Sequence, residues 1–283
     1  MLVTSKEMLE KAYREKYAVV AINTQGGTFD IIRAICMAAE EMKAPVILAH
    51  YLSTGQYSGD DWFFQTAYWW ANKVRVPVAI HLDHGNSFEE CIRMIRQGFT
   101  SIMYDGSCYD IEENALKTNE VLKVAHAVSV PVEAEVGELA RYDENGNAAG
   151  GSNMTKPQDV ERFLHLCQPD SLAIGIGNAH GFYQQKVDIR VDILKECREL
   201  TDIPFVLHGC TGMSTDLIQE SIQYGVAKIN FGTQIRYNYV KYLREGLDRD
   251  IQGHAWKLSQ YASNRLIEDV KDIILLSGSQ NKY

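Results

Sequence analysis

The sequence has no cluster of lysine and arginine residues, and its formal net charge at pH 7 is −9. Nucleic acids and anionic membrane surfaces are bound through positive patches that displace counterions. We therefore expect neither a nucleic acid nor a membrane as a partner. An anionic small molecule can still be bound by backbone N–H groups, which need no basic side chain.

Long apolar stretches and paired cysteines are also missing. No run of about 18 apolar residues occurs, so no transmembrane helix is expected. The N-terminal stretch MLVTSKEMLEKAYREKY lacks the apolar centre of a signal peptide. The six cysteines show no short paired spacing, which argues against a disulfide framework and against a thiolate zinc site. These absences predict a cytoplasmic protein with reduced cysteines.

The chain does contain eight short apolar runs, each followed by a helix-like segment. The runs are rich in Val, Ile, Ala or Leu without clean alternation, as in strands that are covered on both faces. The expected strands are residues 17–23, 45–51, 77–83, 101–105, 131–136, 171–176, 204–207 and 227–231. The helices expected after them are residues 28–43, 61–75, 87–98, 110–128, 156–167, 191–200, 214–224 and 233–247.

This alternation predicts an α/β fold, a (β/α)₈ TIM barrel built as one domain over residues 1–283. Residues 5–16 predict an extra N-terminal helix that closes the bottom of the barrel, and residues 252–283 a C-terminal helical extension. Thr28, Ser87 and Ser214 are suited to cap helices. The segment DWFFQTAYWWANK has apolar residues at helical spacing, which favours core or a subunit interface over a ligand cage.

Residues able to bind a metal lie at the ends of four of the expected strands, on the side that carries the active site in this fold. Strand three ends in IHLDHG, strand five in VEAEVG, strand six leads into GNAHGFY and strand seven into LHGCTG. Imidazole nitrogens and a carboxylate oxygen are the donors that zinc prefers. We assign His84, Glu135, His180 and His208 as metal ligands.

Each of these residue types also has a purely structural interpretation. A histidine in an apolar strand is usually a hydrogen-bonded core residue, and a buried glutamate is usually paired with a cation. We interpret Glu133 in this way, with Lys228 as its inward partner. We interpret His81 as a residue that holds either the turn or the neighbouring Asp83. Asp83 and His84 are adjacent, so both serve one site only if the strand has ended by His84.

Glycines cluster beside the proposed ligands. Gly181 follows His180, Gly209 follows His208, and Gly232 precedes an expected helix start. Backbone amides of glycine-rich turns and helix N-termini hold phosphate, and strands seven and eight are where barrel enzymes commonly place this group. The pattern indicates a phosphorylated small molecule.

The segments AIN, PVAIHLDHG, SIMYDGS, VPVEAEVG, SLAIGIGNAHGFY, PFVLHG and GVAKIN follow one another in this order. Over residues 2–275 the chain resembles the class II, zinc-dependent fructose- and tagatose-bisphosphate aldolases. The resemblance implies a lyase that reversibly cleaves a ketose (bis)phosphate into dihydroxyacetone phosphate and an aldehyde, with zinc as Lewis acid. A homodimer or homotetramer is expected both from the resemblance and from the aromatic segment. A monovalent cation (Na⁺ or K⁺) near the phosphate is implied by resemblance only.

The resemblance also implies roles for single residues. The family's four metal ligands fall on the residues assigned above, and Asp83 falls on the acid that protonates the aldehyde-derived oxygen. The residues expected to bind substrate are Asn23, Gly181, Gly209, Thr211, Asn230, Gly232 and Thr233. At Thr211 the family usually has Ser, and at Gly232 it usually has Asp.

The chain departs from the family pattern in the loop after strand five. In the family this loop supplies the acidic side chain that transfers a proton to or from a carbon atom of the substrate. Where the family reads like ELGxxGGEED, this chain reads EVGELARYDENG. Ala140 and Arg141 replace the two glycines, and the acidic pair aligns with Tyr142 and Asp143. The resemblance therefore leaves Asp143 and Glu144 as alternatives for this acid.

Other departures lie around the far end of the substrate, in AINTQGGTFD, AHYLSTGQYSGDDW and NFGTQIR, and at Gln184. The dihydroxyacetone phosphate half is largely retained. We therefore expect an aldehyde product different from that of the family. The expected substrate is a ketose 1-phosphate whose distal group is not a standard phosphate, and this group is expected near Arg236, Gln25 or Ser53. Two other classes remain open: a metal-dependent sugar-phosphate hydrolase or isomerase, and a non-catalytic aldolase-like partner subunit.

Overall fold

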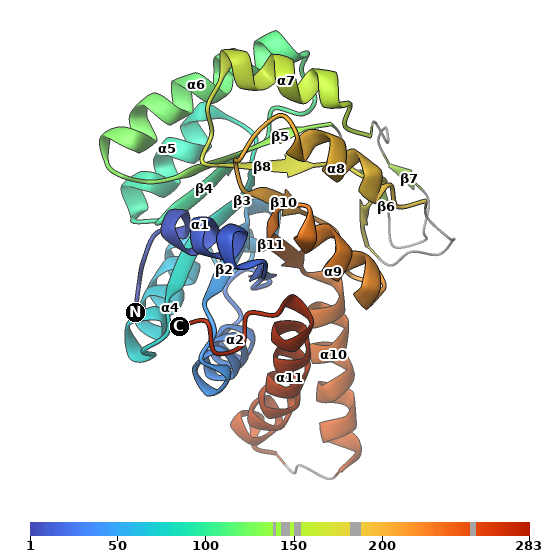
Figure 1. Cartoon of the computed structure of the whole chain (residues 1–283). Coiled ribbons are helices and arrows are strands. Elements are labelled where there is room, and N and C mark those ends of the chain that lie inside the picture. The colour runs from blue at the N-terminus through green and yellow to red at the C-terminus, as the bar shows by residue number, and fades with distance from the viewer. Residues whose placement is uncertain (138–139, 143–147, 150–153, 182–187, 250–252) are drawn as a thin grey trace.

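The computed structural model describes residues 1–137, 140–142, 148–149, 154–181, 188–249 and 253–283 (Figure 1). Eight parallel strands close into a barrel in the order β1-β11-β10-β8-β5-β4-β3-β2. They are β1 Val19–Asn23, β2 Val46–Tyr51, β3 Val78–Gly85, β4 Ser101–Tyr104, β5 Val132–Val136, β8 Ser171–Ile174, β10 Phe205–Leu207 and β11 Val226–Phe231. The predicted TIM barrel is confirmed, and no strand end is displaced by more than two residues.

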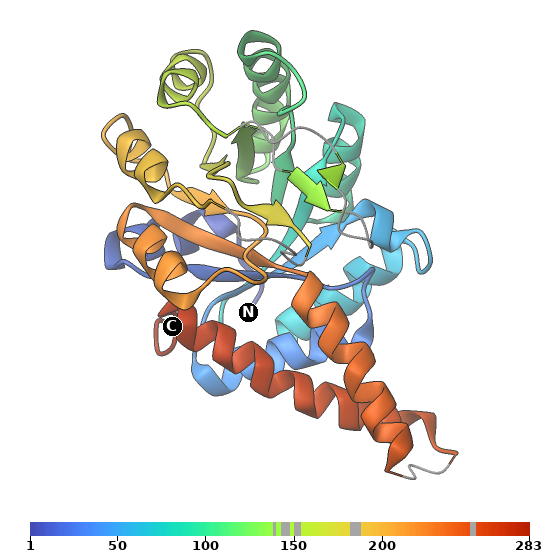
Figure 2. The ribbon, with the colours of Figure 1, turned by 90° about the vertical axis from the view of Figure 1, so that its right-hand side faces the viewer.

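Helices surround this barrel and cover its outer face (Figure 2). They are α1 Ser5–Glu15, α2 Phe29–Met42, α3 Leu52–Gly55, α4 Asp60–Lys73, α5 Phe88–Gln97, α6 Ile111–Ala127, α7 Pro157–Leu166, α8 Val191–Arg198, α9 Thr215–Gln223, α10 Thr233–Asp248 and α11 Ala255–Ser277. None of these described helices combines the length and apolarity needed to cross a membrane.

The two terminal helices have the roles that their sequences predict. Met8, Leu9 and Ala12 of α1 pack against inward-facing strand residues such as Ile47 and Ala79, and so cover one end of the barrel. The C-terminal extension is one long helix, α11, which packs against α2 and lies beside α10 in both views (Figures 1 and 2). The outer helices and strands share one large buried apolar cluster.

Two of the three predicted N-caps have capping hydrogen bonds. Ser87 accepts from the backbone N–H of Glu90 at 3.2 Å, and Ser214 accepts from that of Leu217 at 3.4 Å. Thr28 occupies the N-cap position of α2 as predicted, but its side chain makes no capping hydrogen bond. Its hydroxyl donates to the carbonyl oxygen of Gln25 at 3.0 Å, because the preceding turn brings that carbonyl within reach.

The aromatic segment forms α4 and divides between two environments. Phe63 and Trp70 are buried in the apolar core. Trp62, Tyr68 and Trp69 keep about half of their surface exposed, at 52%, 46% and 51%. The inner face of α4 is therefore core, and its outer face is apolar surface.

Short elements that the sequence pattern did not predict lie at the mouth of the barrel. Helix α3 follows β2, and a small sheet joins β7 (Ala148–Ala149), β6 (Ala140–Tyr142) and β9 (Ala179–His180) in that order. In this sheet Arg141 pairs with His180. The loop after β5 is thereby tied to the strand that carries a proposed metal ligand.

Candidate functional site

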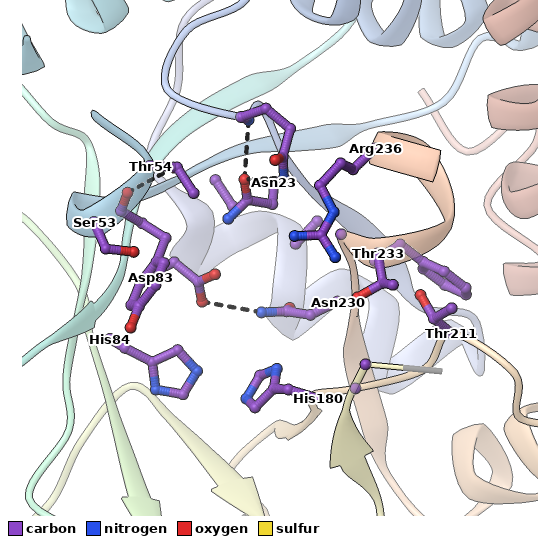
Figure 3. A pocket seen from close by; sticks show the side chains of 18 residues that line it. Asn23, Ser53, Thr54, Asp83, His84, His180, Thr211, Asn230, Thr233 and Arg236 are labelled. Carbon is purple, nitrogen blue, oxygen red and sulfur yellow. Dashed lines mark hydrogen bonds between the residues drawn. The ribbon is translucent and has the colours of Figure 1, made fainter. Parts of the chain in front are cut away.

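Three histidines from separate strand ends meet at the mouth of the barrel. His84 comes from β3, His180 from β9, and His208 follows β10 directly. Their ring centroids are 4.7 to 5.9 Å apart, and one nitrogen of each lies within 4.8 Å of the others. Figure 3 shows His84 and His180 facing each other across the pocket. The predicted histidine set is brought together by the fold.

A bulge in β3 explains how Asp83 and His84 both reach this site. β3 continues through Gly85, so the strand has not ended at His84 as the alternation argument required. Its register with β4 shifts between Leu82 and Gly85, and His84 has a left-handed φ of 55°. One extra residue in the strand re-aims the next side chain. Both side chains therefore point into the mouth.

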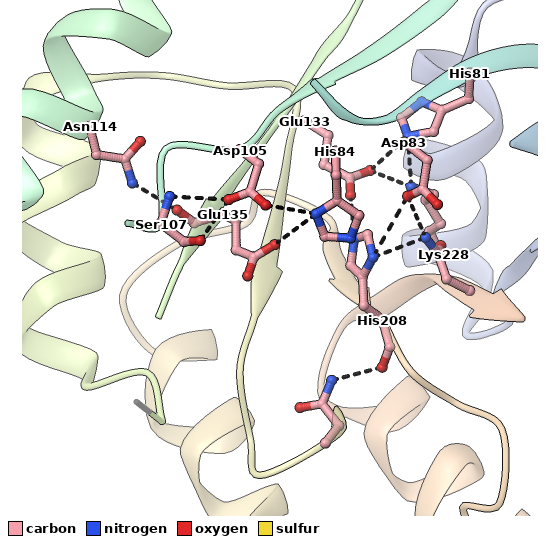
Figure 4. A network of polar contacts seen from close by, with 12 residues as sticks. His81, Asp83, His84, Asp105, Ser107, Asn114, Glu133, Glu135, His208 and Lys228 are labelled. Atoms are coloured by element: carbon pink, nitrogen blue, oxygen red, sulfur yellow. Dashed lines mark hydrogen bonds and ion pairs between the residues drawn. The ribbon is translucent and has the colours of Figure 1, made fainter. Parts of the chain in front are cut away.

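His84 is oriented by a carboxylate behind it (Figure 4). Its Nδ1 lies 2.7 Å from Oδ2 of Asp105, and 3.9 Å from Oε2 of Glu135. Although burial opposes protonation, these contacts and the charge of Asp83 raise the pKa of His84 to about 9 in the metal-free protein. The Nε2 atom of His84 is buried and has no hydrogen-bond partner among the described residues.

His208 is oriented by a buried ion pair that crosses the barrel interior. Its Nε2 lies 2.8 Å from Oε1 of Glu133, whose other oxygen lies 2.6 Å from Nζ of Lys228. Nζ of Lys228 also lies 3.0 Å from Nε2 of His81, and Nδ1 of His81 lies 2.7 Å from the hydroxyl of Ser101. The predicted pairing of Glu133 with Lys228 is present.

The electrostatic environment keeps two of these histidines neutral. Burial, together with the charges of His84 and Lys228, holds the pKa of His208 well below its usual value. Burial and Lys228 do the same for His81. Because Glu133 accepts from the Nε2–H of His208, the lone pair of His208 lies on Nδ1, which accepts from Nδ2 of Asn230 at 3.1 Å and is the ring atom left to bind a metal.

The donor set fits a zinc ion. Glu135 is buried beside His84, and His84, Asp105 and Glu135 form a second group of ligand atoms within 4.8 Å of one another. Three imidazoles and a carboxylate at strand ends match the preferences of zinc. The partnerless nitrogen of His84 suits a metal, because an unsatisfied buried polar atom otherwise costs stability.

Asp83 lies beside the histidines without being one of the clustered donors. Its Oδ1 accepts from Nδ2 of Asn230 at 3.2 Å and lies 3.8 Å from Nδ1 of His208. Burial opposes ionisation, but the nearby imidazoles and Lys228 outweigh it and lower the pKa of Asp83. Asp83 is therefore a carboxylate at neutral pH. Oδ1 of Asn230 is buried without a partner among the described residues.

A cavity of about 350 Å³ opens above these residues. Its lining includes every proposed substrate-binding residue, as well as Asp83, His84 and His180: Asn23, Gly181, Gly209, Thr211, Asn230, Gly232 and Thr233. Gln25, Ser53 and Arg236, expected near the distal group, also line it, and Figure 3 shows Ser53 and Arg236 on opposite sides. Asp143 and Glu144 lie outside the described residues.

The sequence reasoning missed Asp105, Tyr51 and Thr54. Asp105 directly follows β4, so its position at a strand end was an available signal. Tyr51 and Thr54 line the cavity from the end of β2 and from α3. The segment AHYLSTGQYSGDDW that contains them departs from the family pattern, but that departure singled out neither residue.

Comparison with known proteins identifies the family to which this chain is similar. Residues 3–282 match the family profile for class II fructose-bisphosphate aldolase. The chain is 40% identical to the fructose-bisphosphate aldolase of Geobacillus stearothermophilus over 258 residues, covering 88% of this chain and 87% of that protein. It is 37% identical to that of Thermus caldophilus over 274 residues, covering 88% and 89%.

Solved structures show the same architecture. The YdjI aldolase of Escherichia coli K12 superimposes with a TM-score of 0.88 at 29% identity, over 100% of this chain and 99% of that chain. A fructose-1,6-bisphosphate aldolase structure from Coccidioides immitis has a TM-score of 0.87 at 28% identity, over 98% and 96%.

Proposed function

This chain belongs to the class II fructose-bisphosphate aldolase family, and from that premise we propose that it reversibly cleaves a ketose (bis)phosphate into dihydroxyacetone phosphate and an aldehyde. The observation that carries the proposal is the joint placement of three histidines, a buried glutamate and an ionised aspartate at the mouth of the barrel, where His84, His180 and Asp83 line the cavity. Members of this family are metal-dependent lyases.

In this proposal His84, His180, His208 and Glu135 hold a zinc ion. When bound, zinc supplies Lewis-acid chemistry that polarises a ketone and offsets the negative charge left when a carbon–carbon bond breaks. Asp105 and Glu133 hold two of the imidazoles in the tautomers that present a lone pair to the mouth. Such supporting hydrogen bonds commonly raise metal affinity by about 10- to 100-fold.

Asp83 transfers the proton of the substrate hydroxyl whose oxygen becomes the aldehyde oxygen. As a carboxylate it accepts the proton from the hydroxyl that becomes the aldehyde oxygen, and it returns that proton in the condensation direction. Asn230 donates to the same carboxylate and so fixes its direction. The partnerless Oδ1 of Asn230 is available to a hydroxyl of the substrate.

The phosphate of dihydroxyacetone phosphate binds among the backbone amides at Gly181, Gly209 and Gly232 and the hydroxyls of Thr211 and Thr233. Thr233 begins the 16-residue helix α10, whose N-terminal N–H groups favour an anion. At Gly209 φ is +63°, and a Cβ atom would collide with the carbonyl oxygen of Ala179. Glycine therefore allows the close backbone approach that such a site needs.

The aldehyde half lies toward Gln25, Ser53 and Arg236. We propose a ketose 1-phosphate whose distal group is not a standard phosphate, because the segments that carry these residues depart from the family pattern. Arg236 offers a planar cation suited to a carboxylate or a phosphate. Equal activity on fructose 1,6-bisphosphate, tagatose 1,6-bisphosphate and the best alternative sugar would rule out this substrate assignment.

The acid that moves the carbon-bound proton is Asp143 or Glu144 in this proposal. This assignment is supported by the pairing of β6 with β9, in which Arg141 lies opposite His180. Asp143 is the next residue in the sequence after Tyr142, the last residue of β6. Replacing each acid by its amide and measuring turnover distinguishes them.

The proposed function is tested by dihydroxyacetone phosphate release from a panel of ketose phosphates, measured before zinc removal, after it and after zinc is restored. We expect release that disappears with the metal and returns with it. Inorganic phosphate as the product would instead indicate a hydrolase. A zinc-loaded protein that releases neither product from any sugar would indicate a non-catalytic relative.

A further inference from the structure

A second buried polar network lies beside the cavity, outside the residues used so far. His50, in β2, is fully buried, and its Nε2 lies 2.8 Å from Oδ1 of Asp60 at the start of α4. The other carboxylate oxygen of Asp60 accepts from Arg93 of α5. Burial outweighs the carboxylate and lowers the pKa of His50, so the neutral ring donates its Nε2–H to Asp60.

This network is an unusual use of a core position. The ring of His50 stacks on Phe63 at a centroid distance of 4.2 Å and an interplanar angle of 11°, a contact that needs no ring nitrogen. Its Nδ1 is buried and has no hydrogen-bond partner among the described residues. An unsatisfied buried nitrogen lowers the stability of the fold. A role beyond packing would account for a histidine here.

The backbone of α3 rests directly on the bond between His50 and Asp60. A Cβ atom at the buried Gly55 would lie 2.7 Å from Cε1 and 2.9 Å from Nε2 of His50, and 3.0 Å from Oδ1 of Asp60. Ser53 and Thr54, the two residues before Gly55, line the cavity. The position of these side chains therefore depends on where the imidazole and the carboxylate hold Gly55.

The same segment also supports the loop after β1. Ser58 donates to the carbonyl oxygen of Gly26, and Nε1 of Trp62 donates to that of Gly27 at 3.0 Å. Gln25, which precedes these glycines, lines the cavity as well. Gln25, Ser53 and Thr54 thus form one wall of the cavity, which we call the β1–β2 wall, and Figure 3 shows Ser53 and Thr54 across from Arg236 and Thr233.

We propose that His50, Asp60 and Arg93 are positioning residues that set the β1–β2 wall, and through it the fit of the aldehyde half of the substrate. The inference rests on the proposed aldolase function. The phosphate-binding and metal-binding residues come from other strands: β3, β5, β9, β11 and the segment after β10. The network therefore acts on the aldehyde half and leaves the dihydroxyacetone phosphate half unchanged.

The test separates the two halves of the reaction in the zinc-loaded enzyme. Exchange of a carbon-bound proton of dihydroxyacetone phosphate with deuterated solvent needs only that half, whereas cleavage and condensation need both. We expect His50→Phe, which keeps the stacking ring, and Asp60→Asn to lower kcat/KM for cleavage by about 10-fold or more. The KM for the aldehyde should rise, while proton exchange stays within about two-fold.

A matched control is available one residue along the same helix. Asp61 accepts from Nε2 of Gln97 at 2.7 Å, so it also links α4 to α5, but it contacts neither His50 nor Gly55 in the described hydrogen bonds. Asp61→Asn removes the same charge and should leave both rates unchanged. Gly55→Ala keeps every polar group of the network but displaces α3. If a network variant fails to fold, Gly55→Ala should show the same combination of slower cleavage and unchanged proton exchange.

Two results would overturn the inference: a parallel loss of exchange and cleavage in the folded variants, which indicates general structural damage, or normal kinetics in all of them. The failure of the proposed function looks different, since the wild-type enzyme itself would then neither exchange the proton nor release dihydroxyacetone phosphate. The sugar used is the one that wild type cleaves best among fructose 1,6-bisphosphate, tagatose 1,6-bisphosphate and fructose 1-phosphate.

Discussion

Individual side chains at the mouth of the barrel divide into metal donors, a proton-transfer group and supporting carboxylates. His208 and Asp83 lie 3.8 Å apart, yet the proposal gives them different roles. His208 belongs to the donor cluster, and Asp83 is an ionised carboxylate beside it. Their replacement should therefore have separable effects.

His208→Ala should lose bound zinc and activity together, because one donor of the cluster is gone. Asp83→Ala should retain zinc but lose turnover by about 10²-fold or more, as is typical when a positioned acid–base group is removed. Metal analysis and steady-state kinetics on the same preparations check both. Full activity of Asp83→Ala would contradict its assigned role.

Glu133→Gln should destabilise the protein strongly, because it leaves Lys228 buried without a counter-charge. Breaking a buried pair in this way costs about 3–5 kcal/mol. Zinc affinity should also fall, since His208 loses its charged acceptor. Urea unfolding measures the first effect and metal titration the second. The control is Glu41→Gln, which breaks the exposed pair with Lys271 and should cost less than about 1 kcal/mol.

The stability of the metal-free protein should depend on the protonation of His84. The pKa of His84 is about 9 in the folded protein, whereas the ordinary pKa of a histidine side chain is 6.5. The stabilisation from the charged ring is fully present below pH 6.5 and is lost as pH rises through about 9. Urea unfolding at several pH values should show this decline, and His84→Asn should abolish it. A flat profile across this range would contradict the assignment.

Among the secondary-structure elements, β3 determines the site most directly. Its bulge turns Asp83 and His84 to the same side, and Gly85 makes the bulge fit. A Cβ atom at Gly85 would lie 2.7 Å from the carbonyl oxygen of Met103 and 2.8 Å from Sγ of Cys91. The strand can accept no side chain at this position without moving.

Gly85→Ala should therefore cost about 1–3 kcal/mol of stability and weaken zinc binding, because the bulge must shift and His84 with it. Thermal unfolding and metal titration are the measurements. Gly253→Ala is the comparison, since a Cβ atom there meets nothing within 4 Å even though φ is +64°. It should leave zinc binding unchanged. Equal zinc affinity in both variants would show that the bulge does not position His84.

For the whole molecule, the exposed face of α4 supports the expectation of a homodimer or homotetramer. Trp69→Glu places a charge on this face, where the tryptophan is 51% exposed, and should shift the sedimentation mass toward the 32.0 kDa of one chain. Leu166→Glu on α7, where leucine is 48% exposed, is the matched control. An unchanged mass for Trp69→Glu, or a monomeric wild type, would remove α4 as the interface.

The sequence alone determined the barrel, the order of its strands and the residues that could bind a metal. Short apolar runs are typical of strands that are buried on both faces. In a parallel barrel the carboxyl ends of all strands lie at the same mouth. Asp83, Glu135 and the three histidines were therefore predictable from local position. Asp143 and Glu144 remain predictions, since they lie outside the described residues.

The tertiary structure decided what local pattern does not encode. The bulge at His84, the hydrogen bond from that ring to Asp105, and the support of α3 by His50 and Asp60 each join residues that face one another only after the chain has folded. Periodicity reports which face a side chain occupies. Distances between separate elements depend on register, on backbone dihedrals such as the positive φ of His84, and on the packing of the intervening helices.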